Sequence, residues 1–87
     1  MKDKGVIVSV NYLRDLIAFE CDGDYGYFEI TQGNGFEMDE FEIDDIVYGD
    51  LKTLGNTTVT KNKSNKPCHI TIEDYGLVLE QVLEAIS

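Results

Sequence analysis

The sequence predicts a small, mostly β protein, an antiparallel barrel of five strands with one α-helix at the C-terminus. Three observations lead to this fold class. Short runs of β-branched and aromatic residues alternate with polar ones, glycine-containing turns separate these runs, and helical spacing of apolar residues occurs at the end of the chain. The length of 87 residues corresponds to one domain. We expect the barrel at about residues 4–72 and the helix at about residues 74–86. A different small α+β arrangement, with a meander and one helix, is the alternative.

The first part of the chain is typical of a three-stranded meander. Residues 6–12 alternate with period two and are rich in valine, which predicts a first strand. Residues 16–21 and 25–31 form the next two expected strands. Between them lies Asp22-Gly23, a dipeptide that tolerates positive φ angles and favours a tight hairpin.

The middle of the chain contains further strand signals around polar turns. Residues 46–52 predict a fourth strand, and residues 57–60 and 68–72 are also strand-like. Residues 61–67 are polar and carry three lysines, as expected for a solvated loop. We expect the core to contain one inward-facing set of side chains: Val6, Val8, Phe19, Phe28, Val47 and Val59. A shift of one residue in register would turn all side chains of a strand to the other face.

The C-terminal segment has the spacing of an amphipathic helix. Asp74 is a suitable N-cap residue. The apolar stripe that follows consists of Val78, Leu79, Val82, Leu83 and Ile86. Because a helix of this length is not stable alone, the stripe must pack against something. We expect it to pack on its own barrel, with a partner or dimer contact as the alternative.

The chain is strongly acidic, with a formal net charge of −10 at pH 7. This charge repels phosphate backbones and favours a basic partner. The sequence has no apolar run long enough to cross a membrane. Residues 1–4 lead directly into the first strand without the apolar region of a signal peptide, so we expect a cytoplasmic protein.

Two stretches of the meander carry a family resemblance. Gly5, Asn11 and the basic Arg14 frame residues 5–19, with apolar residues at the strand positions between them. This stretch resembles, without gaps, the opening of a cold-shock-type OB domain. Residues 22–29 are similar to the second motif of that family. The similarity covers residues 5–31 and, more faintly, residues 44–60, and it implies an OB-like barrel.

The resemblance also implies which residues form the ligand face of such a barrel. They are Ser9, Leu16, Ala18, Tyr27 and Glu29. The family has stacking aromatic rings at most of these positions, whereas only Tyr27 is aromatic here. Single-strand binding depends on aromatic platforms in a basic groove, so we expect nucleic-acid binding to be lost. A degenerate single-stranded nucleic-acid binder of the cold-shock type is the alternative.

An acidic segment after the meander is the second candidate site. Its residues are Glu37, Asp39, Glu40, Phe41, Glu42, Asp44 and Asp45. Runs of like charge are usually solvated, but apolar side chains among the acids suit a basic, apolar surface of another protein. A loop that covers one end of the barrel is the alternative interpretation.

No pattern in the sequence indicates an enzyme or a metal protein. P-loop, GxSxG, HExxH and dinucleotide-binding motifs are absent. Cys68 and His69 are neighbours in a strand and point to opposite faces. Cys21 and Cys68 have no CxxC spacing, so we expect buried free thiols. We therefore expect no catalytic residue, metal or cofactor, and a non-catalytic protein-interaction domain.

Overall fold

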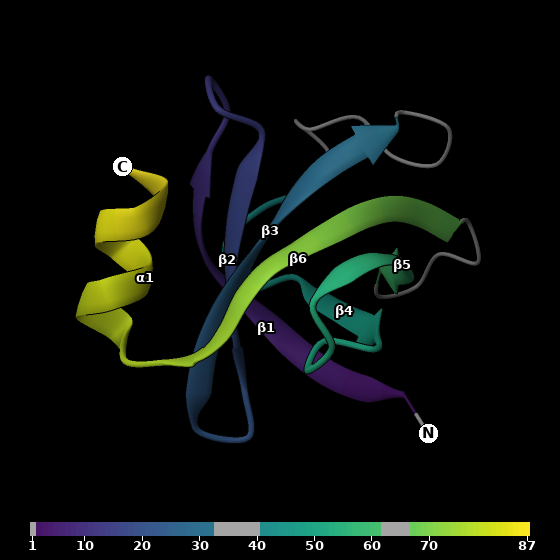
Figure 1. The fold of residues 1–87 in the computed structure, drawn as a ribbon, viewed down its shortest axis with the longest axis horizontal. Helices are drawn as coiled ribbons and strands as arrows, with labels where there is room; N and C mark the ends of the chain where they lie inside the picture. Colours follow the sequence, from purple (N-terminus) through teal and green to yellow (C-terminus); the bar gives the residue numbers. More distant parts are fainter. Residues whose placement is uncertain (1, 33–40, 62–66) are drawn as a thin grey trace.

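The computed structural model describes residues 2–32, 41–61 and 67–87. These residues form six strands and one helix (Figure 1). The elements are β1 (Asp3–Asn11), β2 (Leu16–Cys21), β3 (Asp24–Gln32), β4 (Ile46–Gly49), β5 (Gly55–Lys61), β6 (Pro67–Leu77) and α1 (Leu79–Ile86).

The strands close into an antiparallel barrel in the order β1-β2-β3-β6-β5-β4. The last strand of this order, β4, pairs with the beginning of β1 and closes the barrel. The predicted fold class is confirmed, although the barrel has six strands and not the predicted five. The segments around residues 57–60 and 68–72 each form a separate strand, and these two strands pair with each other.

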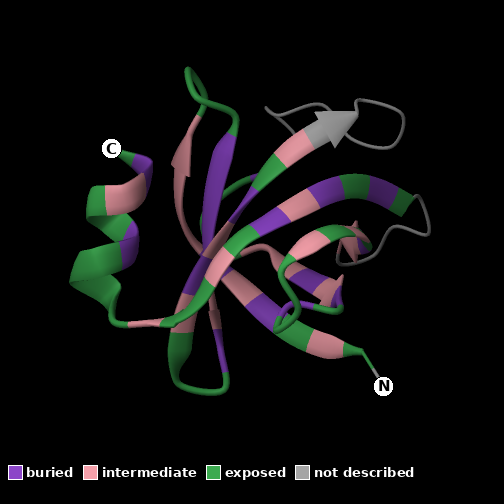
Figure 2. Ribbon diagram, in the orientation of Figure 1, coloured by how far each residue is buried: buried purple, intermediate pink, exposed green. Residues whose placement is uncertain are grey.

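The barrel core is built from residues of every strand (Figure 2). Phe28 lies at its centre, with ring centroids 6.0 Å from Phe19 and 6.1 Å from Phe41. The core positions predicted for β2 to β5 are confirmed, because Phe19, Phe28, Val47 and Val59 are all buried.

The prediction was wrong for β1, where Val6 and Val8 are only partly buried. Gly5 and Ile7 face the interior there. A Cβ atom on Gly5 would lie 2.7 Å from Leu51 Cδ1, so the interior has no room for a side chain at this position. A β-bulge between Ile7 and Ser9 then shifts the register of the rest of the strand.

The predicted start of the helix was also wrong. Strand β6 continues to Leu77, and Val78, not Asp74, occupies the N-cap position of α1. The backbone of β6 follows β3 over this stretch, with Asp74 opposite Tyr27 and Leu77 opposite Tyr25. Cross-strand pairing therefore overrides the local capping preference of Asp74.

Helix α1 packs on the outside of its own barrel, against β1, β2 and β3 (Figure 1). Its buried side chains, Val82 and Ile86, contact Leu16 and Ala18 of β2. The other members of the predicted stripe remain partly or largely exposed: Val78, Leu79 and Leu83. With eight residues, α1 lacks the length of a membrane-spanning helix.

Candidate functional site

The five residues assigned to the ligand face lie together on the outer surface of β1, β2 and β3. Ser9 of β1 is opposite Ala18, and Ala18 is opposite Tyr27 of β3. Leu16 is opposite Glu29 in the same way. These five residues are therefore neighbours on the three strands.

Helix α1 covers the part of this outer surface that Leu16 and Ala18 form. Leu16 retains 6% of its surface and Ala18 none, because Val82 and Ile86 pack directly on them. Tyr27 is partly buried at the margin of the same cluster. Helix α1 therefore occupies the space over Leu16 and Ala18, whereas Glu29 remains exposed.

Asn11 at the end of β1 and Arg14 in the β1–β2 turn bind the C-terminal end of α1. The side-chain amide of Asn11 donates a hydrogen bond to the carbonyl of Ile86. The guanidinium of Arg14 donates to the carbonyls of Ala85, at 3.2 Å, and Ser87, at 2.6 Å. The last carbonyls of a helix lack partners within the helix, and a cation is favourable at that end.

Asn11 and Arg14 are also two of the residues that carry the family resemblance. In this structure the Oδ1 atom of Asn11 accepts hydrogen bonds from the backbone N–H groups of Leu13 and Arg14 and shapes the turn. No local sequence pattern indicates their contacts with α1, because more than 70 residues separate the partners.

A shallow apolar groove lies between the β1–β2 turn and α1. Its volume is about 470 Å³. Leu13 is 98% exposed on its rim, and Tyr12 and Leu83 are also exposed. The hydroxyl of Tyr12 donates a hydrogen bond to the carbonyl of Phe41, which brings the acidic segment next to the groove. Sequence reasoning did not identify this groove, since its two walls come from opposite ends of the chain.

The described part of the acidic segment, residues 41–45, lies against β1. The backbone of Ile7 exchanges hydrogen bonds with Asp44 and Asp45. Phe41 is fully buried in the barrel core and is not accessible to a partner. Asp45 pairs with Lys61 at 3.3 Å, whereas Glu42 and Asp44 are exposed. Glu37, Asp39 and Glu40 lie outside the described residues.

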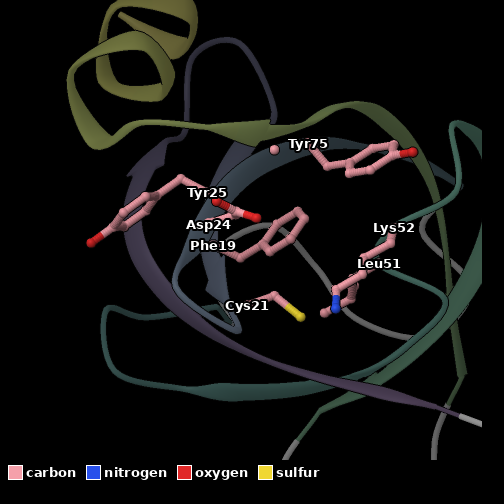
Figure 3. A pocket seen from close by; sticks show the side chains of 8 residues that line it. Phe19, Cys21, Asp24, Tyr25, Leu51, Lys52 and Tyr75 are labelled. Atoms are coloured by element: carbon pink, nitrogen blue, oxygen red, sulfur yellow. The ribbon is translucent and has the colours of Figure 1, made fainter.

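A small cavity opens at the other end of β2, beside the β2–β3 hairpin (Figure 3). It has a volume of about 140 Å³. Its wall is formed by Phe19, Cys21, Asp24, Tyr25, Leu51, Lys52, Tyr75 and Gly76. The sequence did not predict this cavity, because the hairpin, the β4–β5 turn and the end of β6 each contribute part of its wall.

The charges near this cavity are mainly negative. Burial raises the pKa of the Cys21 thiol, and the carboxylates of Asp22, Asp3 and Glu20 raise it further. Lys52 opposes them, but its ammonium is 2.6 Å from Asp22. The hydrogen bond from Lys52 lowers the pKa of Asp22, and the same contact raises the pKa of Lys52.

Asp3, Cys21 and Asp22 bring three ligand atoms within 4.8 Å of one another. Two of these residues already have partners, since Asp22 binds Lys52 and Asp3 accepts a hydrogen bond from the Leu51 N–H group. We therefore assign no metal to this group. Cys68 is buried and His69 is exposed, so these neighbours do not face each other.

Comparison with known proteins finds no matching family model and no significant match among curated proteins or solved structures.

Proposed function

We propose that this chain is a non-catalytic protein-interaction domain with an OB-like, cold-shock-like barrel, and that its partner has a basic surface. One observation carries the proposal. Helix α1 occupies the outer face of β1 to β3, on which a cold-shock-type domain would stack bases, and it buries Leu16 and Ala18 there. The domain therefore uses a surface other than this face.

The charge of the chain supports a protein partner over nucleic acid. Base stacking contributes about 1–3 kcal/mol per base in single-strand binding proteins, within a basic groove that follows the backbone. Here the net charge is −10, and the basic Arg14 is bonded to the end of α1. Binding of phosphates would have to overcome long-range repulsion.

The groove beside α1 is the proposed interaction surface. Tyr12, Leu13 and Leu83 present apolar area to solvent, and exposed apolar clusters of this kind are typical of contact sites. The hydroxyl of Tyr12 donates a hydrogen bond to the carbonyl of Phe41, and the exposed acidic residues Glu42 and Asp44 follow Phe41 in the chain. A partner surface with apolar residues and basic neighbours matches this arrangement.

Fluorescence anisotropy at physiological salt tests the proposal with defined probes. We expect a labelled peptide of alternating arginine and leucine to bind, and a glutamate–leucine peptide, oligo-dT and oligo-U not to bind. Leu13→Ser should weaken binding of the basic peptide about tenfold by removing apolar contact area. Leu54→Ser is the matched control, because Leu54 is also exposed but does not line the groove.

An oligonucleotide dissociation constant of about 1 µM or lower, equivalent to about −8 kcal/mol, would reject the proposal. That result would favour the alternative function, a degenerate single-stranded nucleic-acid binder. Equal effects of Leu13→Ser and Leu54→Ser would instead reject the groove as the contact surface.

A further inference from the structure

The cavity at the β2–β3 hairpin is not used by the groove contact. The groove lies at the β1–β2 turn, whereas the cavity is lined by Phe19 and Cys21 in the other half of β2. The two places share no lining residue. The cavity is therefore a second feature of the surface, with its own shape and chemistry.

Aromatic and apolar side chains form the interior of this cavity. Figure 3 shows the ring of Phe19 between Asp24 and the side chains of Leu51 and Lys52, with the ring of Tyr75 beside them. Phe19 is 1% exposed, so its ring belongs to a fixed core, whereas Tyr75 is 42% exposed at the rim. Two aromatic rings thus border a space whose volume, about 140 Å³, is that of a site for one small planar group.

Two glycines lie close to these side chains, one next to the Phe19 ring and one in the cavity wall. A Cβ atom on Gly26 would lie 2.7 Å from Phe19 Cζ and 2.6 Å from the Asp74 carbonyl oxygen, so a side chain there would displace the Phe19 ring or β6. Gly76 lines the cavity with a φ of +73°, a conformation that side chains rarely adopt. Gly26 therefore allows the Phe19 ring and β6 to approach closely, and Gly76 allows the backbone conformation of the cavity wall.

The charge around the cavity selects a cation. Asp24 is part of the wall and is exposed to solvent. Asp3, Glu20 and Asp22 lie close enough to act on the Cys21 thiol in the same wall. Lys52 is already bound to Asp22, so Asp24 is available for an added positive group.

We propose that the cavity binds one arginine side chain of the basic partner. A guanidinium is planar, stacks on aromatic rings and forms two parallel hydrogen bonds with a carboxylate. Tyr75 supplies an exposed ring at the rim, Phe19 forms the apolar floor, and Asp24 supplies the carboxylate. A lysine ammonium is more strongly hydrated and offers no planar face, so it fits this site less well. The site deepens the proposed function and rests on it.

NMR chemical-shift mapping on the intact protein tests this site with three small probes. They are blocked Gly-Arg-Gly, its lysine analogue and its citrulline analogue, which keeps the shape of arginine but has no charge. We expect the arginine probe to shift the backbone amides of Asp24, Leu51 and Gly76. The citrulline probe should bind at least about tenfold more weakly, because it lacks the charge-assisted contact. Equal binding of arginine and citrulline would overturn the proposal.

Two isosteric variants distinguish direct binding of the probe by Asp24 from the effect of losing one negative charge anywhere on the surface. Asp24→Asn should weaken the arginine probe about tenfold, whereas Glu73→Gln should leave its affinity unchanged. Both residues are exposed, and each substitution removes one negative charge, but Glu73 does not line the cavity. Equal effects of the two variants would overturn the proposal.

The same spectra distinguish failure of this site from failure of the proposed function. If the arginine–leucine peptide shifts Leu13 and Leu83 but not Asp24 and Gly76, the arginine site is rejected and the proposed function stands. If neither set of amides shifts with any basic probe, both are rejected. Shifts of Asp24 and Gly76 that disappear in Asp24→Asn support the arginine site.

Discussion

The two faces of β2 are both buried, but different structures cover them. Ile17, Phe19 and Cys21 point into the barrel, where residues of all the strands surround them. Leu16 and Ala18 point outward and are covered mainly by one helix of eight residues. The inward side chains of β2 are buried by residues from all the strands of the closed barrel. The outward side chains are buried by α1, which is too short to be stable alone. We therefore expect the barrel core to contribute most of the stability, and the helix to decide whether the outer face of β2 is exposed.

The largest expected effect concerns the inner face. Phe28→Ala removes the ring that contacts both Phe19 and Phe41 and leaves a cavity in the core. We expect the free energy of unfolding to fall by about 3–5 kcal/mol, measured by urea denaturation. Leu54→Ala serves as the control, since this side chain is 58% exposed. A loss below about 1 kcal/mol for Phe28→Ala would contradict the expectation that the barrel core contributes most of the stability.

A smaller effect is expected when α1 is detached from the outer face of β2. Val82→Asp places a charge between α1 and Ala18, so the helix should detach while the barrel stays folded. Because two helix side chains then lose their burial, the loss should be about 1–3 kcal/mol after the recovered chain entropy is subtracted. Leu83→Asp should cost less, since Leu83 is 40% exposed. If Val82→Asp unfolds the barrel completely, the barrel does not stay folded without α1.

A still smaller effect should follow from the contacts at the end of α1. Arg14→Ala removes the donors to the carbonyls of Ala85 and Ser87 and should cost about 0.5–1.5 kcal/mol. Hydrogen exchange should accelerate in α1 and remain unchanged in β5 and β6. Lys4→Ala is the control for loss of one exposed positive charge. Uniform acceleration in both variants would show that α1 does not open separately from the barrel.

The smallest effect concerns a surface ion pair at the cavity end of β2. Lys52 lowers the pKa of Asp22, so the folded state binds the Asp22 proton less tightly than the unfolded state does. The resulting stability is present above the unfolded pKa of this carboxyl and is lost as the pH falls through the folded pKa. Lys52→Met should raise the pKa of Asp22 toward its ordinary value in an NMR titration. An unchanged pKa would show that Lys52 is not the cause.

Local sequence signals were sufficient for most of the inner face. Period-two alternation located the first three strands, and the Asp22-Gly23 turn has the positive φ angles, 53° and 89°, that this dipeptide favours. The same alternation was not sufficient in β1, because the bulge near Val8 and the close approach of Leu51 to Gly5 depend on other strands. Which side chains of a strand point into the barrel was therefore predictable only where no long-range contact changed the register.

The candidate sites were less accessible to sequence reasoning. The family resemblance predicted that Ser9, Ala18 and Tyr27 share one surface. The strand register places them opposite one another on β1, β2 and β3. The groove and the hairpin cavity each combine segments from distant parts of the chain, and no local pattern marks them. The amphipathic spacing indicated that α1 would pack, but not which of its residues would be buried.

The sequence by itself determined the strand periodicity, the turn chemistry, the acidity and the presence of a helix that needs a surface. Only the tertiary structure decided that β6 would continue past Asp74, that α1 would cover Leu16 and Ala18, and that Asn11 and Arg14 would hold its end. The physical reason is the range of the interactions. Periodicity and turns depend on neighbouring residues, whereas a covered face depends on contacts between segments about 70 residues apart, which form only when the barrel closes.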